Sequence, residues 1–325
     1  MKRKDQEFIS KYSKSQDFEK VISSLNMALV SKEELFSQDE AKENYTNIHI
    51  LGVPRSGTTL INQYLASGLD VGYINNLIAA FWKAPLHGVH LSKKLLGTNF
   101  CSSFDSAFGK TLAIKEPHEF GYFWSDILGF DDLKAPTSEQ KRNQNLVHLS
   151  NQLNNISNAF DKPVIYKSIF LGWSASRVAE LMPKSLFIYV KRNWMDNALS
   201  LLKIRDKYFQ NHETWASFKP AEYQELKSMT PIEQVVGQVY YLNRSFEKEM
   251  SKIKTANKIT INYEDFTKRP KDLTDLIIYK ARCLGGKVNQ DETEVPAYFD
   301  LKKQQIDSEL KGKLTNAYLK FKDNE

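Results

Sequence analysis

Cysteine is scarce in this sequence, and long apolar runs are missing altogether. Cys101 and Cys283 are the two cysteines among 325 residues, which excludes a disulfide framework and the cysteine spacing of a zinc site. So little cysteine is typical of a reducing compartment. No stretch has the roughly 20 apolar residues that a membrane span needs, and MKRKDQEF at the start lacks the apolar core of a signal peptide. We therefore expect a cytoplasmic protein without a transmembrane segment, while peripheral membrane contact stays open.

An excess of one charge is also missing. The sequence has 45 basic and 39 acidic residues, a formal net charge of +6. This excess is too small to predict nucleic-acid binding, but it suits an anionic small ligand. A hydrophobic content of 41% is ordinary for a globular protein, so the chain is long enough to form one large domain with insertions.

Short apolar segments alternate with helical patterns along most of the chain. The expected strands lie near residues 48–53, 71–73, 163–167, 185–190 and 258–262. Strands that are apolar throughout and separated by helices are typical of a parallel sheet buried on both faces. We predict an α/β fold with a P-loop-type parallel sheet of about five strands, flanked by helices on both faces and carrying helical insertions.

The predicted organisation has three parts. Residues 1–46 form an N-terminal helical extension, residues 47–290 the α/β domain, and residues 291–325 a partly helical tail. Within the domain, residues 84–160 are expected to be an insertion that binds the acceptor or acts as a lid. Residues 84–112 of it show no clear periodicity, and residues 139–160 are expected to form one helix.

The segment NIHILGVPRSGTTL, residues 47–60, is the strongest local signal. It is an apolar strand followed by a glycine-bearing turn and a helix, and the free N–H groups of a helix start bind phosphate. Gly52 and Gly57 have the GxxxxG spacing of a P-loop, but Thr58 stands where an ATP-binding loop has lysine. The loop offers one guanidinium and three hydroxyls instead, from Arg55, Ser56, Thr58 and Thr59. These groups suit an anionic phosphate ester. An ordinary turn with hydroxyl caps is the alternative.

A second motif follows the strand at 185–190. Arg192 lies at its carboxyl end, where open α/β sheets bind ligands. Ser200 comes eight residues later, about two helical turns on, and therefore shares a face with Arg192. A guanidinium and a hydroxyl together suit a second phosphate. Alternatively, Arg192 pairs with Asp196 at the helix start.

With both motifs in place, the chain resembles the sulfotransferase superfamily. These proteins bind 3′-phosphoadenosine 5′-phosphosulfate (PAPS), pass its sulfuryl group to a hydroxyl or amine, and release the bisphosphate PAP. The matching pieces are PRSGTTL at 54–60, Arg192 with Asp196 and Ser200, and the triplet Tyr263, Glu264 and Asp265. The segments SGLDVGYINNLIAAFW and KEPHEFGYFW are similar to bacterial enzymes that modify polysaccharides or glycolipids.

The resemblance implies roles for individual residues. It implies that the 5′-phosphosulfate is held by Arg55, Ser56, Gly57, Thr58 and Thr59, and the 3′-phosphate by Arg192 and Ser200. Arg55 and Lys167 would stabilise negative charge in the transition state, and no metal is required. The acceptor would be a hydroxyl on a saccharide or glycolipid, and nucleic acid is not expected as a partner. The oligomeric state does not follow from the sequence.

The general base does not carry over from the family. Lys167 matches its motif, but Ile169 stands where cytosolic members have the catalytic histidine, and the C-terminal RKG motif has no clear match. Among the residues of KEPHE, we rank His118 first as the base, Glu119 second and Glu116 third. His118 packing at a helix start is an equal alternative. The functional alternatives are a non-catalytic PAPS- or PAP-binding member of the fold and a small-molecule P-loop kinase.

Overall fold

The structure is a computed structural model that describes residues 15–97, 100–107, 109–130, 132–211, 213–301 and 306–323. Among these residues, no helix is both long and apolar enough to cross a membrane. The first part of the expected N-terminal extension, residues 1–14, lies outside the described residues.

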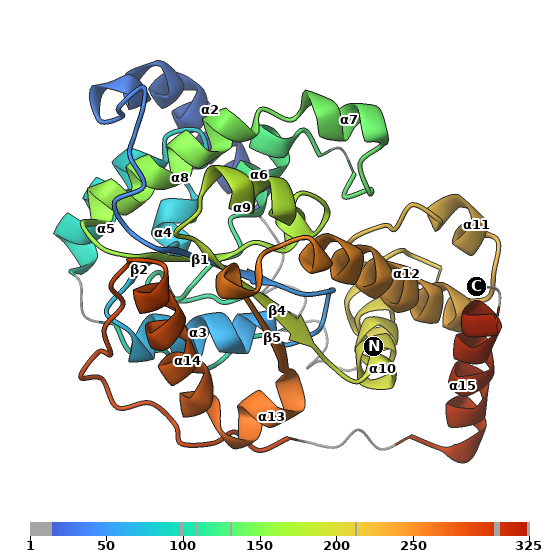
Figure 1. The fold of residues 1–325 in the computed structure, drawn as a ribbon. Coiled ribbons are helices and arrows are strands. Elements are labelled where there is room, and N and C mark those ends of the chain that lie inside the picture. Colours follow the sequence, from blue (N-terminus) through green and yellow to red (C-terminus); the bar gives the residue numbers. More distant parts are fainter. Residues whose placement is uncertain are drawn as a thin grey trace.

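The centre of the fold is a five-stranded parallel sheet, which confirms the predicted fold class (Figure 1). Its strands are β1 (Asn47–Leu51), β2 (Gly72–Tyr73), β3 (Val164–Lys167), β4 (Leu186–Lys191) and β5 (Lys258–Asn262). The strand order is β2-β3-β1-β4-β5. All five strand boundaries lie within two residues of the predicted ones.

The central strand β1 pairs with β3 on one side and β4 on the other. Ile50 of β1 lies opposite Lys167 of β3 and Ile188 of β4. All five residues of β1 are buried. Parallel strands in register end at one edge of the sheet, so the segments that follow β1, β3 and β4 meet there.

Helices cover both faces of the sheet (Figure 1). On one face, α3 (Thr58–Gly68) and α14 (Pro270–Cys283) pack on residues such as Ile48 and Ile188. On the other face, α8 (Leu146–Phe160), α9 (Ala175–Leu181) and α12 (Pro231–Ser251) pack on residues such as Tyr166 and Phe187. Burial on both sides explains why the strands are apolar throughout.

The remaining helices fill the connections. They are α2 (Gln16–Leu29), η1 (Val30–Leu35), α4 (Asn76–Ala79), α5 (Pro85–Leu96), α6 (Gly121–Leu128), α7 (Ser138–Asn143), η2 (Ile169–Trp173), α10 (Trp194–Ile204), η3 (Arg205–Phe209), α11 (Tyr223–Lys227), η4 (Thr255–Asn257), α13 (Tyr263–Lys268) and α15 (Ser308–Asp323). The structure therefore has a helix, α5, inside the segment 84–112 that shows no clear periodicity in the sequence. The single helix expected at 139–160 is two helices, because the Asn145 side chain accepts the His148 N–H and starts α8 afresh.

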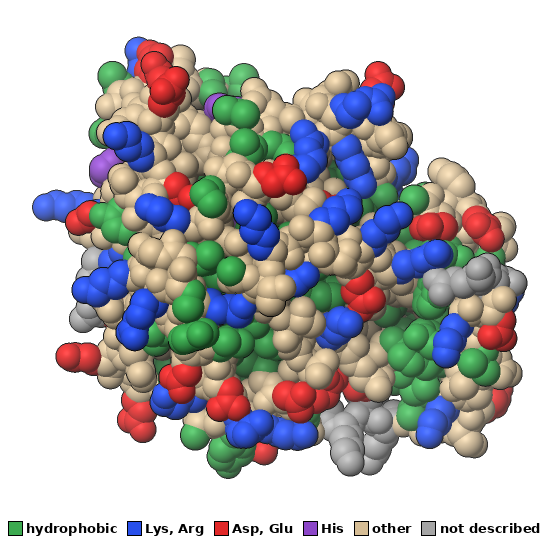
Figure 2. Space-filling model, viewed as in Figure 1, with side chains coloured by type: hydrophobic (Ala, Val, Ile, Leu, Met, Phe, Trp, Pro, Cys, Tyr) green, Lys and Arg blue, Asp and Glu red, His purple; other side chains and the backbone are tan. Residues whose placement is uncertain are grey.

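A third apolar cluster lies beside the sheet, where α15 packs on α12 and α10 (Figure 1). Its centre includes Val236, Val239, Leu314 and Phe321. Figure 2 shows Lys and Arg side chains spread over the visible face, with Asp and Glu among them. This mixture agrees with the small net charge.

Candidate functional site

The loop after β1 turns tightly into α3. The Ser56 N–H donates to the Val53 carbonyl at 3.1 Å, and Arg55 and Gly57 have positive φ angles of 71° and 96°. A Cβ at Gly52 would lie 2.9 Å from the backbone carbonyl oxygen of Val190, so only glycine fits there. The turn aims the first N–H groups of α3 at the space beside the loop, as a phosphate site requires.

Tyr263, the first residue of α13, supports this loop. A Cβ at Gly57 would lie 2.1 Å from the Tyr263 ring, so the ring packs directly on the glycine backbone. The Arg192 guanidinium lies over the same ring, with Cζ 4.9 Å from its centroid. Tyr263 therefore contacts both proposed phosphate-binding elements at once.

The structure brings Arg192 and Ser200 to the loop. Arg192 Nη1 donates to the Arg55 carbonyl at 2.8 Å, and Arg55 Nε donates to Ser200 Oγ at 3.0 Å. The two anion sites expected from the sequence are thus joined through Arg55. Among the described residues, the buried Nε of Arg192 and the buried hydroxyl of Ser56 have no hydrogen-bond partner.

Two guanidinium groups therefore lie close together in a largely buried setting. Burial lowers the pKa of Arg55 to about 10, and the positive charge of Arg192 adds to this lowering. Arg55 is charged at neutral pH, and the two guanidinium groups repel each other. A bound anion would relieve this repulsion and supply an acceptor to the unpaired Nε.

Lys167 approaches the loop from the end of β3. Its side chain is 5% exposed, and its ammonium donates to Thr59 Oγ1 at 3.0 Å and to Glu119 Oε2 at 2.8 Å. A buried ammonium requires such partners. The structure thus places a cation, a hydroxyl and a carboxylate together at the start of α3.

The backbone of Gly109 lies above these groups. Thr59 Oγ1 donates to the Gly109 carbonyl at 3.5 Å. A Cβ at Gly109 would lie 3.4 Å from Arg55 Nη1 and 3.6 Å from Lys167 Nζ, and its φ is 85°. Part of the predicted insertion therefore covers the loop. Sequence reasoning missed Gly109, because nothing near it in the chain indicates this long-range contact.

The three predicted base candidates have different surroundings. His118 Nδ1 accepts the Phe120 N–H at 2.9 Å, next to the start of α6, as the helix-start alternative predicts. Glu116 is buried and accepts from Gln63, Ser102 and Ser103, which ties residues 102 and 103 to α3. Glu119, through its ion pair with Lys167, is the candidate joined to the loop.

Position 169, where cytosolic sulfotransferases have a histidine, has a buried isoleucine. Ile169 is 5% exposed and belongs to the apolar cluster under α6 and α8. Among the described residues, no group of three or more His, Cys, Asp or Glu side chains could hold a metal ion.

Comparison with known proteins identifies the family of this chain. The sequence model of the sulfotransferase family matches residues 47–281, which is more than half of the chain. A search of curated proteins finds no match.

Solved structures with a similar chain path are bacterial sulfotransferases. STF9 from Mycobacterium avium is 11% identical with a TM-score of 0.48, and the match covers 93% of this chain and 76% of that one. STF1 from Mycobacterium tuberculosis H37Rv is 12% identical with a TM-score of 0.43, covering 90% and 75%. The enzyme from Alicyclobacillus acidocaldarius is 13% identical with a TM-score of 0.40, covering 85% and 92%. The family assignment rests on the sequence match.

Proposed function

This chain belongs to the sulfotransferase family, and from that premise we propose that it transfers a sulfuryl group from PAPS to a hydroxyl of a carbohydrate or glycolipid. The observation that supports the donor assignment is the meeting of two guanidinium groups, that of Arg55 on the loop and that of Arg192, which reaches the loop from the end of β4. Their mutual repulsion and the unpaired buried Nε of Arg192 fit a ligand with several negative charges.

The residues around the loop fit the two ends of this donor. Arg55, Gly57, Thr58 and Thr59 would hold the 5′-phosphosulfate at the start of α3, and Arg192 with Ser200 would hold the 3′-phosphate. The Ser56 hydroxyl lies against Gly52, so Ser56 would contribute after a rotation of its side chain. When bound, PAPS supplies an activated sulfuryl group on its 5′-phosphate.

The protein's own groups would then act on charge and on one proton. Lys167 and Arg55 would stabilise negative charge on the leaving phosphate. Glu119 would accept the proton of the acceptor hydroxyl, because its carboxylate already lies beside Lys167 and Thr59. We therefore rank Glu119 before His118, whose Nδ1 is engaged by the backbone of Phe120.

Ligand binding separates the donor proposal from a kinase. We expect 3′,5′-ADP to raise the melting temperature of the protein and ATP with Mg²⁺ to have no effect, because a site for the 3′-phosphate is what distinguishes the two ligands. Arg192→Ala would abolish the shift, whereas Arg269→Ala, which changes an exposed arginine outside the site, would preserve it. A shift with ATP and Mg²⁺ alone would contradict the proposal.

Turnover with labelled PAPS separates an enzyme from a non-catalytic binder. Glu119→Gln is expected to lower kcat at least ~100-fold, as loss of a general base does, while the affinity for 3′,5′-ADP stays near that of the wild type. His118→Ala serves as the comparison. If kcat fell further in His118→Ala than in Glu119→Gln, His118 would be the general base, as the sequence predicts, and our ranking of Glu119 would be wrong.

A further inference from the structure

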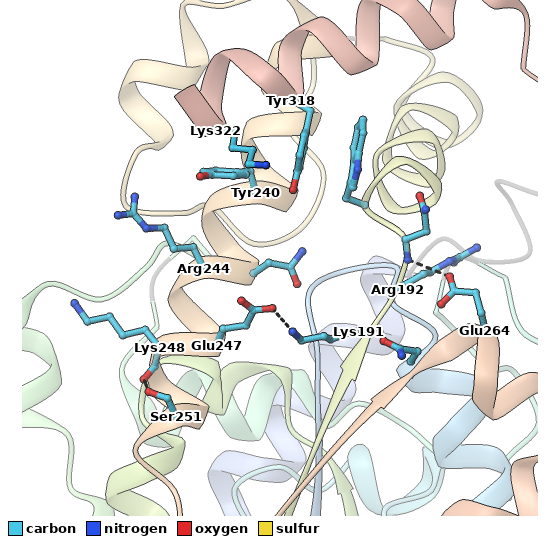
Figure 3. Close-up of a pocket in the computed structure, with 14 residues that line it drawn as sticks. Lys191, Arg192, Tyr240, Arg244, Glu247, Lys248, Ser251, Glu264, Tyr318 and Lys322 are labelled. Carbon is cyan, nitrogen blue, oxygen red and sulfur yellow. Dashed lines mark hydrogen bonds and ion pairs between the residues drawn. The ribbon is translucent and has the colours of Figure 1, made fainter. Parts of the chain in front are cut away.

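A cavity of about 960 Å³ is lined by Arg192 and its neighbours after β4 and by residues of α12 and α15. Side chains of neighbouring strand residues point to opposite faces, so Lys191 faces this cavity while Arg192 reaches the loop (Figure 3). Helices α12 and α15 form its other walls (Figure 3). We call this cavity the α12 groove. We call the loop between β1 and α3 the donor loop. Its contacts involve Arg192 but not the end of the α12 groove that lies farthest from Arg192.

Cations outnumber carboxylates in the α12 groove. The lining includes two carboxylates, Glu247 and Glu264, and, apart from Arg192 at the border with the loop, four cations, namely Lys191, Arg244, Lys248 and Lys322. Glu247 pairs with Lys191 at 2.7 Å, and Glu264 accepts the Asn193 N–H at 3.0 Å. Both carboxylates are therefore engaged by the protein itself, which leaves the groove with an excess of positive charge.

The outer cations come from two helices. Arg244 and Lys248 are one turn apart on α12 and extend on the same side of it (Figure 3). Lys322 lies in the last turn of α15. Among the described residues, no ion pair is found for the exposed ammonium groups of Lys248 and Lys322. A negatively charged ligand would therefore meet them without first breaking an ion pair.

Aromatic rings line the inner wall. Trp194 and Tyr318 stack with centroids 4.2 Å apart and an interplanar angle of 12°. Tyr240 meets Tyr318 edge to face at 5.7 Å. All three side chains line the groove, and each is half-buried. Trp194 and Tyr318 cover each other's stacked faces, so a ring-shaped ligand would place its C–H face on the exposed parts of these half-buried rings.

We propose that the α12 groove binds an anionic saccharide, with its rings on Trp194 and Tyr318 and its acidic groups on Lys248 and Lys322. The groove borders Arg192, so a saccharide held there extends toward the donor site. It follows that the acceptor is an acidic carbohydrate, an identification that rests on the proposed function. Binding to the groove itself is independent of catalysis and is measured separately.

The test is a calorimetric titration of the full chain, saturated with 3′,5′-ADP so that the donor site is filled. The probes are tetragalacturonate, its methyl ester and a chondroitin sulfate tetrasaccharide. We expect at least one acidic probe to bind, and the neutral ester to bind at least ~10-fold more weakly than the free acid. Raising the salt concentration would weaken the binding of the acidic probe, because the contacts are between charged groups.

Variants locate the binding. The double variant Lys248→Glu and Lys322→Glu is expected to weaken the acidic probe at least ~10-fold, whereas the same sites changed to arginine would retain binding. The control is Lys32→Glu with Lys94→Glu, which makes the same charge change at exposed sites on η1 and α5, away from α12 (Figure 1). Unchanged melting temperatures would verify that the variants are folded.

Three results would overturn this proposal. They are equal affinity for the ester and the acid, an equal loss in the control variant, and no binding of either acidic probe. If the acidic probe binds as expected but labelled PAPS is never turned over, the groove assignment stands and the proposed sulfuryl transfer fails. If labelled PAPS is turned over but neither acidic probe binds, the proposed sulfuryl transfer stands and the groove assignment fails.

Discussion

Gly57 has no room for a side chain. Gly57→Ala would force a Cβ to 2.1 Å from the Tyr263 ring at a φ of 96°, so the ring must move off the loop. We expect a loss of about 1–3 kcal/mol in the free energy of unfolding and weaker binding of 3′,5′-ADP. Urea denaturation and a thermal-shift titration measure the two effects.

Gly312→Ala is the matched control for Gly57→Ala. Gly312 lies in α15, and a Cβ there would meet nothing within 4 Å. Alanine in place of a helical glycine is expected to raise stability by about 0.5–1 kcal/mol. If both variants changed stability equally, contact with Tyr263 would not be the cause.

His49 makes the stability of the fold depend on pH. Its ring is buried between Tyr166 and Phe187 in the centre of the sheet, and burial lowers its pKa from 6.5 to about 3. As the pH falls below 6.5, the unfolded chain takes up a proton at this residue and the folded chain does not. The contribution of His49 to the free energy of unfolding is therefore complete above pH 6.5 and is lost as the pH falls toward 3.

The size of this effect is measurable. The loss from His49 begins near pH 6.5 and reaches roughly 2 kcal/mol at pH 5, since the slope below pH 6.5 is about 1.4 kcal/mol per pH unit. His49→Gln is expected to flatten this slope in urea denaturation at a series of pH values. His148→Gln, a change at an exposed histidine, would retain the slope; an unaltered slope in His49→Gln would contradict the assignment.

At the scale of the elements, Glu116 anchors the segment that crosses the proposed donor site. Its carboxylate accepts from Gln63 on α3 and from Ser102 and Ser103. Glu116→Ala would leave buried donors unpaired, at a cost of about 1–3 kcal/mol. We expect faster proteolytic cleavage within residues 100–107 and weaker donor binding. Glu34→Ala, at an exposed carboxylate, would leave the cleavage rate unchanged.

The elements also show what local patterns can predict. The strands follow from the short apolar segments of the sequence. The approach of Arg192 and Ser200 to the loop follows from their eight-residue spacing and from the position of Arg192 at a strand end. Both are patterns among residues close together in the sequence. Helix α5 was predictable as well, because Pro85 at its first turn and Gly97 at its end are helix boundary signals, although the periodicity between them is weak.

The contacts that complete the site were not predictable in the same way. Tyr263 on Gly57, Gly109 above Arg55 and the ion pair of Glu119 with Lys167 each join residues far apart in the sequence. The sequence favours His118 over Glu119 as the general base because the intrinsic pKa of histidine lies near neutrality. The hydrogen bond that occupies His118 Nδ1 depends on the turn into α6, which only the folded chain defines.

At the scale of the whole molecule, one apolar cluster stands apart from the sheet. Helix α15 buries Leu314, Ala317 and Phe321 against α12 and α10. Deleting residues 308–325 would expose this cluster but leave the packing on both faces of the sheet intact. We expect a folded protein whose free energy of unfolding is lower by about 3–5 kcal/mol.

Thermal unfolding by circular dichroism measures this loss. The control is Leu319→Ala, since this side chain is 46% exposed on the same helix, and it is expected to have little effect. A deletion variant as stable as the full chain would contradict the importance of the third cluster. The same deletion removes Tyr318 and Lys322 from the α12 groove, so acidic saccharides would bind more weakly.

The strand order of the sheet links the proposed nucleotide site to the stability of the fold. The loop proposed to bind the donor follows β1, Lys167 ends β3 and Arg192 follows β4, which are the three middle strands, whereas the outer strand β2 supplies none of them. Alterations that tune the affinity for the nucleotide therefore act on the same strands that hold the fold together.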